Sequence, residues 1–245
     1  MSIWRYANPA EFMRVTGHLI TPVWVAAVVI TGFGIAWALF FIPPDYQQGS
    51  TVKILYIHVP AALFAINAYF LMAVASVIGL IRRHHVSFLV AKAVAPIGAA
   101  FTLVTLVTGA VWGEPMWGTW WAWDARLTSS LIMFLFYLGY MSVWAAIDEP
   151  EKAQDLSAIT CLVGVVFAVM SRYAVEFWAT LHQGASLSVR EGQRIDDVFR
   201  TPLYVCMAGF FCLFLALLLT RARTEIRLRR ARAIRQRDSL QQVEA

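Results

Sequence analysis

The sequence predicts an all-α integral membrane protein, a bundle of six transmembrane helices with a tryptophan-rich amphipathic loop on its outer face. Sixty per cent of the 245 residues are apolar and only 14% are charged. The mean hydropathy is +0.63, well outside the range of soluble domains. Six apolar stretches reach the roughly 20 residues that cross a bilayer. Because hydrocarbon offers the backbone no hydrogen-bond partner, each span is expected to be helical.

Charges, prolines or glycines bound each of these spans. Pro43 and Pro44 stop the first, and Pro60 suits the first turn of the second. The fifth closes in a stretch that runs to Gly184, a residue well placed to end a helix. Residues 221–245 form a basic tail that is expected to continue the last helix to the cytoplasmic lipid surface. The spans of this single membrane domain, residues 1–245, are expected at about 19–41, 60–81, 91–112, 128–147, 158–177 and 202–220.

The distribution of lysine and arginine predicts that both termini are cytoplasmic. Fourteen of these residues fall on the side of the termini, eight of them in the basic tail, and five fall on the other side. Arg172 lies within the fifth span and is not counted. Basic residues concentrate in cytoplasmic segments. The three longest connections, about 42–59, 113–127 and 178–201, are therefore expected to face outside.

The connection after the third span is unusually rich in tryptophan. In a helix, Trp117, Trp121 and Asp124 would share one face, which predicts an amphipathic helix on the outer membrane surface. An ordinary aromatic belt accounts for two or three tryptophans at an interface, but not for five in one loop beside Asp124 and Arg126. Stacking on a large planar apolar ligand explains such a cluster better. Half of the chain's ten tryptophans lie here, namely Trp112, Trp117, Trp120, Trp121 and Trp123.

Two histidines flank this stretch along the chain. His58 is expected at the outer mouth of the second span, and His182 just beyond the fifth. Trp178 precedes His182 by four residues, so in a helix its ring would flank the imidazole. Arg172 and Glu176 have the same spacing and can form a structural ion pair. Taken singly, each histidine is more often an interfacial residue that bonds the backbone than a ligand.

Together these residues favour a haem site. Two neutral imidazoles can occupy both axial positions of a haem iron, Arg126 can meet the propionates, and Asp124 can orient Arg126 or an indole N–H. Zinc fits less well, because it has no use for five tryptophans. An electron-transfer cytochrome would hold haem between mid-span histidines, which this sequence lacks. The cysteines Cys161, Cys206 and Cys212 form no C-x-x-C-H pattern for covalent attachment.

The tryptophan stretch also carries a family resemblance. Residues 117–124, Trp-Gly-Thr-Trp-Trp-Ala-Trp-Asp, match the W-G-x-x-W-x-W-D (WWD) pattern of the haem-handling membrane proteins of cytochrome c biogenesis. The chain most closely resembles the CcmC family, also called haem exporter protein C. The similarity covers essentially the full length and includes Tyr56–Ala62, Ala95–Gly98 and Thr180–Gly184.

The resemblance implies a multi-pass protein of the bacterial inner membrane that is not an enzyme. It would hold haem b, non-covalently and transiently, on the periplasmic face. His58 and His182 would be the axial ligands. The haem would pass to the haem chaperone CcmE. The small membrane protein CcmD and the ABC-transporter subunits CcmA and CcmB would complete the complex. The cofactor-binding residues would be His58, His182, Trp112, Trp117, Trp120, Trp121, Trp123, Asp124, Arg126 and Trp178.

Several alternatives and exclusions accompany that expectation. ATP hydrolysis would come from partners, because the chain has no G-x-x-x-x-G-K-[S/T] phosphate-binding loop. The basic tail is expected to contact the lipid bilayer, and nucleic acid is not an expected partner. The competing functions are a transmembrane haem transporter, a b-type haem electron-transfer subunit, and a structural subunit anchored by its tryptophans.

Overall fold

The prediction of six membrane-spanning helices is confirmed. The computed structural model describes residues 8–182, 187–188, 192–193 and 195–244. Six helices in this part of the chain are long and apolar enough to cross a membrane. A short 3₁₀ helix, η2 (Ser50–Ile54), precedes the second, and a two-residue antiparallel pair, β1 (Leu187–Ser188) and β2 (Gly192–Gln193), precedes the last. The helices are α1 (Pro9–Phe41), α2 (Leu55–Arg82), α3 (His85–Trp117), α4 (Ala125–Ala146), α5 (Pro150–Phe177) and α6 (Asp197–Glu244).

Most helices extend beyond the apolar spans, because capping groups rather than hydropathy set their ends. The Asn8 side chain accepts a hydrogen bond from the first turn of α1, and Pro9 follows at the first helical position. Arg83 adopts a left-handed conformation, with φ at 50°, and ends α2. The last helix runs without a break through the basic tail to Glu244, so the expected continuation of that helix is confirmed.

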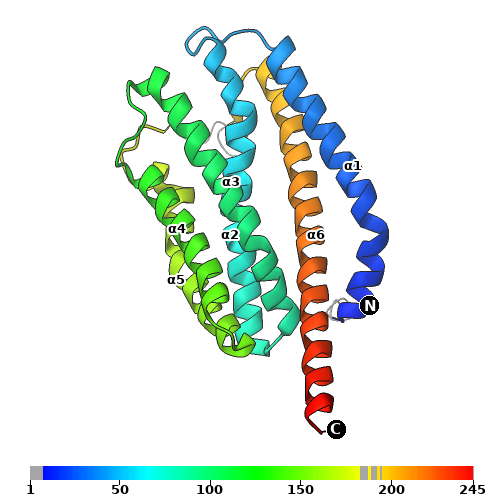
Figure 1. Cartoon of the computed structure of the whole chain (residues 1–245). Coiled ribbons are helices and arrows are strands. Elements are labelled where there is room, and N and C mark those ends of the chain that lie inside the picture. The colour runs from blue at the N-terminus through cyan, green and yellow to red at the C-terminus, as the bar shows by residue number, and fades with distance from the viewer. Residues whose placement is uncertain (1–7, 183–186, 189–191, 194, 245) are drawn as a thin grey trace.

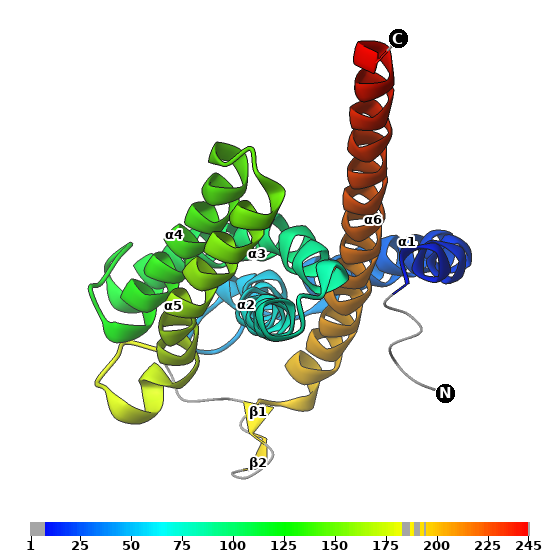
Figure 2. The ribbon, with the colours of Figure 1, turned by 90° about the horizontal axis from the view of Figure 1, so that it is seen from below.

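The helices form three adjacent pairs: α2 with α3, α4 with α5, and α1 with α6. Seen from below, the α2–α3 pair lies between the other two (Figure 2). Both termini lie at one end of the bundle (Figure 1). The α1–α2, α3–α4 and α5–α6 connections therefore gather at the opposite end, which is the end where the sequence places its candidate site.

Two buried tyrosines lock α2, α3, α4 and α5 together beneath that end. The Tyr137 hydroxyl of α4 donates a hydrogen bond of 2.8 Å to the Ala65 carbonyl of α2. The Tyr69 hydroxyl of α2 donates one of 3.1 Å to a carbonyl of α5. The two rings meet edge to face with centroids 4.8 Å apart. Gly98 of α3 and Gly164 of α5 make room for them, because a Cβ at either position would collide with a tyrosine. Small residues allow the same close approach in other membrane bundles.

The start of the basic tail packs against the bundle at the end that holds the termini. The Glu225 side chain is only 8% exposed and pairs with Lys92 of α3 at 3.1 Å. Arg221 lies 3.7 Å from the same carboxylate. Two residues before Glu225, Arg223 donates a 2.6 Å hydrogen bond to the Met13 carbonyl of α1. These contacts hold α6 against both α1 and α3.

Substituting Gly98 with alanine tests the tyrosine lock. The added methyl group has no space beside Tyr137, so we expect Gly98→Ala to lower the free energy of unfolding by roughly 1–3 kcal/mol. Gly32→Ala is the matched control, because nothing lies within 4 Å of the Cβ it would add. Thermal unfolding in detergent micelles provides the measurement. Equal stability of the two variants would show that the packing around Tyr137 is loose.

Candidate functional site

The tryptophan stretch is a break between two helices. α3 ends at Trp117, and Gly118 takes a left-handed conformation with φ at 73°. Residues 118–124 then have no regular secondary structure until α4 begins. The Asp124 side chain caps α4 by accepting a 2.7 Å hydrogen bond from the Leu127 N–H. The predicted amphipathic helix through Trp117, Trp121 and Asp124 is therefore wrong, because a glycine stop and an aspartate cap interrupt it.

A second helix also ends earlier than predicted. α5 stops at Phe177, and Trp178 has an extended backbone, with φ at −130° and ψ at 150°. Without a helix here, Trp178 does not flank His182, so that prediction is wrong as well. The Trp178 side chain is 51% exposed and contacts the ring of Phe177. Gly184, the predicted end of the helix, lies outside the described residues.

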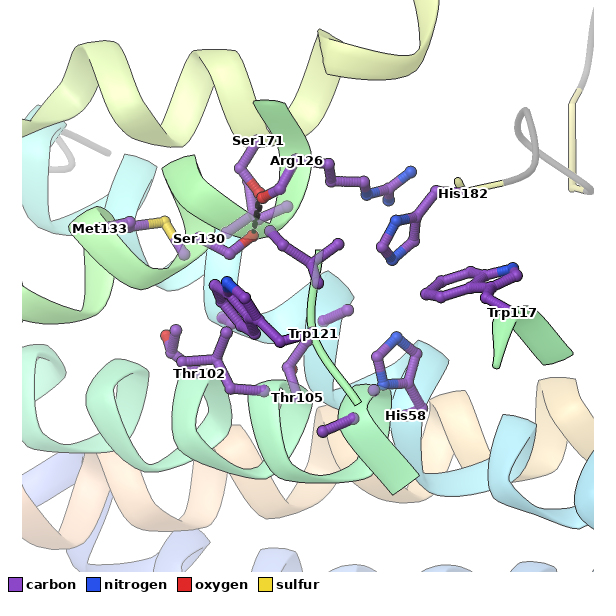
Figure 3. Close-up of a pocket in the computed structure, with 17 residues that line it drawn as sticks. His58, Thr102, Thr105, Trp117, Trp121, Arg126, Ser130, Met133, Ser171 and His182 are labelled. Carbon is purple, nitrogen blue, oxygen red and sulfur yellow. Dashed lines mark hydrogen bonds between the residues drawn. The ribbon is translucent and has the colours of Figure 1, made fainter. Parts of the chain in front are cut away.

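The structure brings five of the predicted site residues to one pocket. This pocket lies at the end of the bundle opposite the termini and has a volume of about 50 Å³. α2, α3, α4 and α5 all contribute to its wall, together with the connections that follow α3 and α5. The two imidazoles face a common space beside one tryptophan ring, and the second tryptophan lies further along the pocket (Figure 3). The five residues are His58, Trp117, Trp121, Arg126 and His182.

The remaining tryptophans of the stretch have other surroundings. Trp112 supports His58 from outside the pocket, with ring centroids 5.6 Å apart, and its Nε1 donates a 3.0 Å hydrogen bond to Gln48. Trp120 is 60% exposed and Trp123 is 78% exposed, and neither lines the pocket. The ring of Trp123 meets that of Trp121 edge to face at 5.5 Å. The stretch thus has an inner side facing the pocket and an outer, exposed side.

The predicted pair between Arg172 and Glu176 is not formed. Within the described residues, no ion pair of 4.0 Å or less joins the two side chains, and both are exposed. The guanidinium of Arg172 lies over the ring of Tyr173 instead, 5.2 Å from its centroid. A four-residue spacing permits a pair on a helix but does not enforce it.

His58 is held against α3 by a hydroxyl group. Its Nδ1 lies 2.9 Å from the Thr108 Oγ1, and that hydroxyl donates its own proton to the Val104 carbonyl at 2.6 Å. The threonine oxygen must then accept from the imidazole, so the proton of His58 sits on Nδ1 and Nε2 keeps its lone pair. Gly109 permits this approach, because a Cβ there would lie 3.0 Å from the imidazole Cε1.

Sequence reasoning missed Thr108, although a signal for it exists. Thr108 and Trp112 are four residues apart on α3, so they share the helix face that contacts His58. Their common partner, His58, lies 50 residues before Thr108 in the chain. Only the pairing of α2 with α3 brings the three residues together.

His182 is held by the connection that carries Asp124. Its ring packs on Trp117 with centroids 4.9 Å apart. The Asp124 Oδ2 accepts a 3.2 Å hydrogen bond from the Leu181 N–H and lies 3.7 Å from the His182 Nδ1. That nitrogen is buried and has no hydrogen-bond partner among the described residues. A lone pair on Nδ1 would be repelled by the carboxylate, so the proton belongs on Nδ1. Nε2 then keeps its lone pair, as in His58.

The electrostatics of the pocket keep His182 neutral. Burial and the positive charge of Arg126 lower its pKa to about 4, against an opposing contribution from Asp124. An imidazole with that pKa is uncharged at neutral pH, the form in which it coordinates metals. The positive charge of Arg126 thus disfavours protonation of His182 and leaves an imidazole lone pair available to a metal.

Several polar groups in the pocket have no partner in the described part of the protein. The Arg126 side chain lines the pocket without an ion pair or hydrogen bond to any described residue, and the buried Trp121 Nε1 is also unpartnered. Such groups are costly to bury unless something pairs with them. A guanidinium and an indole N–H both favour an anionic ligand. No group of three or more metal-binding side chains of His, Cys, Asp or Glu occurs among the described residues.

The six apolar helices define a multi-pass membrane protein. At one end it gathers two imidazoles and a guanidinium that has no partner among the described residues. The profile of CcmC, described as "Heme exporter protein C", matches residues 2–237. The chain is 60% identical to heme exporter protein C of Paracoccus denitrificans, over 98% of this chain and 99% of the relative. It is 44% identical to that of Escherichia coli K12, over 91% and 89%. The chain therefore belongs to the heme exporter protein C family, a haem-handling component of the cytochrome c maturation system.

The neutrality of His182 can be measured in haem-free protein. Selective histidine labelling and NMR should give a titration midpoint near pH 4 for His182, against about 6.5 for an unperturbed imidazole. Arg126→Gln should raise this pKa, because a repelling positive charge is lost. Asp124→Asn should lower it, and asparagine can still cap α4. A midpoint near 6.5 that ignores Arg126→Gln would contradict the assigned electrostatics.

Proposed function

We propose that this protein binds haem b non-covalently on the periplasmic face of the bacterial inner membrane and delivers it to the haem chaperone CcmE. One observation carries the proposal: His58 and His182 face the same pocket (Figure 3), beside an arginine without a partner among the described residues. Haem has matching features, an iron that takes two axial imidazoles and two carboxylates on one edge of an apolar plane.

Each named residue then has a distinct role. The Nε2 atoms of His58 and His182 bind the iron, since each Nδ1 faces a group that favours a proton on it. Trp117 and Trp121 supply aromatic faces for the macrocycle. Arg126 pairs with the propionates by charge-assisted hydrogen bonds. Trp112 acts from behind His58 and supports its ring.

The exposed side of the tryptophan stretch is the proposed contact surface for the chaperone. Trp120 and Trp123 are exposed, and Trp123 touches a wall residue of the pocket. A partner that covers Trp120 and Trp123 would lie next to the pocket wall, so it could approach the haem without any helix having to unfold. Trp178 is exposed on the α5–α6 connection and belongs to the same proposed surface. Such a surface would present haem to a partner. No side chain of this protein is proposed to form a covalent bond with the haem macrocycle.

The family and the charge distribution support the proposed membrane setting and partners. The excess of lysine and arginine on the side of the termini supports a cytoplasmic location for that end, and hence a periplasmic location for the pocket. The word exporter in the names of the relatives supports a multi-subunit assembly. We assign ATP hydrolysis to CcmA and CcmB, and we include CcmD in the complex.

The inner part of the pocket gives no specific support to a transport path or to an electron-transfer site. Thr102 donates its hydroxyl proton to the Gly98 carbonyl, and Ser130 and Ser171 hydrogen-bond each other. These polar groups are satisfied within the protein. Polar groups of the pocket that have no partner among the described residues lie nearer the connections, on Arg126 and His182.

Removing both histidines tests the ligand assignment. Purified His58→Ala/His182→Ala protein should lose the absorption spectrum of six-coordinate haem and most of its haem, because no axial donor remains. His18→Ala is the control, since this exposed residue of α1 lies far along the chain from the pocket. The pyridine haemochrome assay measures haem content. Unchanged haem content in the double variant would refute the assignment.

Removing Trp117 and Trp121 tests whether these rings bind the haem macrocycle. Trp117→Ala/Trp121→Ala should reduce haem affinity by roughly tenfold or more, since each aromatic contact contributes about 0.5–1.5 kcal/mol beyond its area. Loading of the purified chaperone should fall in parallel. Trp24→Ala, in α1 and outside the pocket, should load the chaperone normally. Normal loading by the double variant would contradict a role in haem binding and leave the two tryptophans as interfacial residues only.

A further inference from the structure

The two histidines are held by chemically different groups. His58 donates to a neutral hydroxyl that is already committed to the Val104 carbonyl. His182 faces a carboxylate, Asp124, whose side chain is 8% exposed. Hydrogen bonding of an imidazole N–H to a carboxylate makes the other nitrogen a stronger donor to a metal. A neutral hydroxyl is a weaker acceptor than a carboxylate, so it strengthens the other nitrogen less.

We propose that Asp124 and Thr108 are positioning residues that give the two axial ligands unequal strength, so that His58 yields first when an incoming ligand takes the iron. His182 keeps its hold until the transfer is completed. This inference rests on the proposed function, because it assumes that haem binds between the two imidazoles.

The connection that carries His182 has the contacts needed to keep this ligand in place. The Thr180 Oγ1 accepts a 3.2 Å hydrogen bond from the His182 N–H, and the same hydroxyl lies 3.3 Å from the His182 carbonyl, to which it donates. The Leu181 N–H binds Asp124, and Trp117 covers one face of the ring. The absence of helical structure at 178–182 therefore does not leave the imidazole loosely attached.

The carboxylate is positioned to tighten on a ligated imidazole. The distance of 3.7 Å between the His182 Nδ1 and the Asp124 Oδ2 exceeds that of a charge-assisted hydrogen bond by about 0.8–1.0 Å. Coordination of Nε2 makes the Nδ1 proton more acidic and strengthens its attraction to the carboxylate. Because this Nδ1 has no other partner among the described residues, the shift creates a hydrogen bond without breaking one.

On the other side, Thr108 fixes the direction of His58 without strengthening it. Its oxygen accepts from Nδ1, and its proton is directed to the backbone of its own helix. The ring also rests against Gly109 and the edge of Trp112. These contacts would keep the Nε2 of His58 directed towards a bound iron, so that this ligand could leave and return.

Carbon monoxide identifies the ligand that yields. In purified, haem-loaded, reduced protein, CO replaces one axial imidazole, and the C–O stretching frequency reports the donor strength of the imidazole that remains. We expect the wild-type adduct to have the frequency of the His58→Ala adduct, because His182 remains in both. A wild-type frequency equal to that of His182→Ala, or two bands of similar intensity, would overturn the proposed order.

A second comparison leaves both histidines in place. Asp124→Asn keeps a capping side chain but removes the charge, so it should weaken His182 as a donor and raise the C–O frequency. Asp124→Glu should restore the frequency towards wild type. Thr108→Val should leave the CO adduct unchanged, because His58 has already left the iron, while Thr108→Ser controls for the loss of the hydroxyl in the CO-free spectrum.

These outcomes separate the two proposals. A shift in Thr108→Val alone, or no shift in Asp124→Asn, overturns the ligand order even if the single histidine variants retain no haem. Wild-type haem content in the double histidine variant overturns the proposed function, and the ligand order falls with it.

Discussion

The Asp124 carboxylate is the interaction on which the candidate site depends. One oxygen caps α4 through the Leu127 N–H, and the other accepts from Leu181 and faces His182. A single side chain thus joins the connection after α3 to the connection after α5, which are separated by 57 residues. Its side chain is largely shielded from water, so this junction is stronger than a surface contact would be. The second histidine reaches the pocket because this junction fixes the segment that carries it.

Beneath this junction, the packing of the helices supplies the rigid half of the site. Lipid gives no hydrogen bonds and little hydrophobic drive for association, so close packing and satisfied polar groups hold such bundles together. Tyr137 and Tyr69 meet both needs, because each fills the space left by a glycine and donates to a carbonyl of another helix. His58 belongs to α2 and contacts Thr108 of α3, whereas His182 lies in the connection after α5. The pocket therefore combines one ligand on a packed helix with one on a segment secured by local hydrogen bonds.

The sequence predicts the frame better than the connections. Hydropathy identifies all six helices, because lipid imposes helical structure on every apolar span. Five of the ten residues predicted for the site meet in the pocket, but their geometry was not predictable from the sequence. Four-residue spacing suggested helices through Trp121 and through His182, where Gly118 and the end of α5 interrupt them. The contact between His58 and Thr108 joins two helices, and no local pattern encodes such a contact.

The most direct measurement is a structure of the haem-loaded protein. We expect one haem in the pocket, with its iron bound by the Nε2 atoms of His58 and His182 and a propionate at Arg126. This expectation would be contradicted by haem that lies on the exposed faces of Trp120 and Trp123, away from both imidazoles.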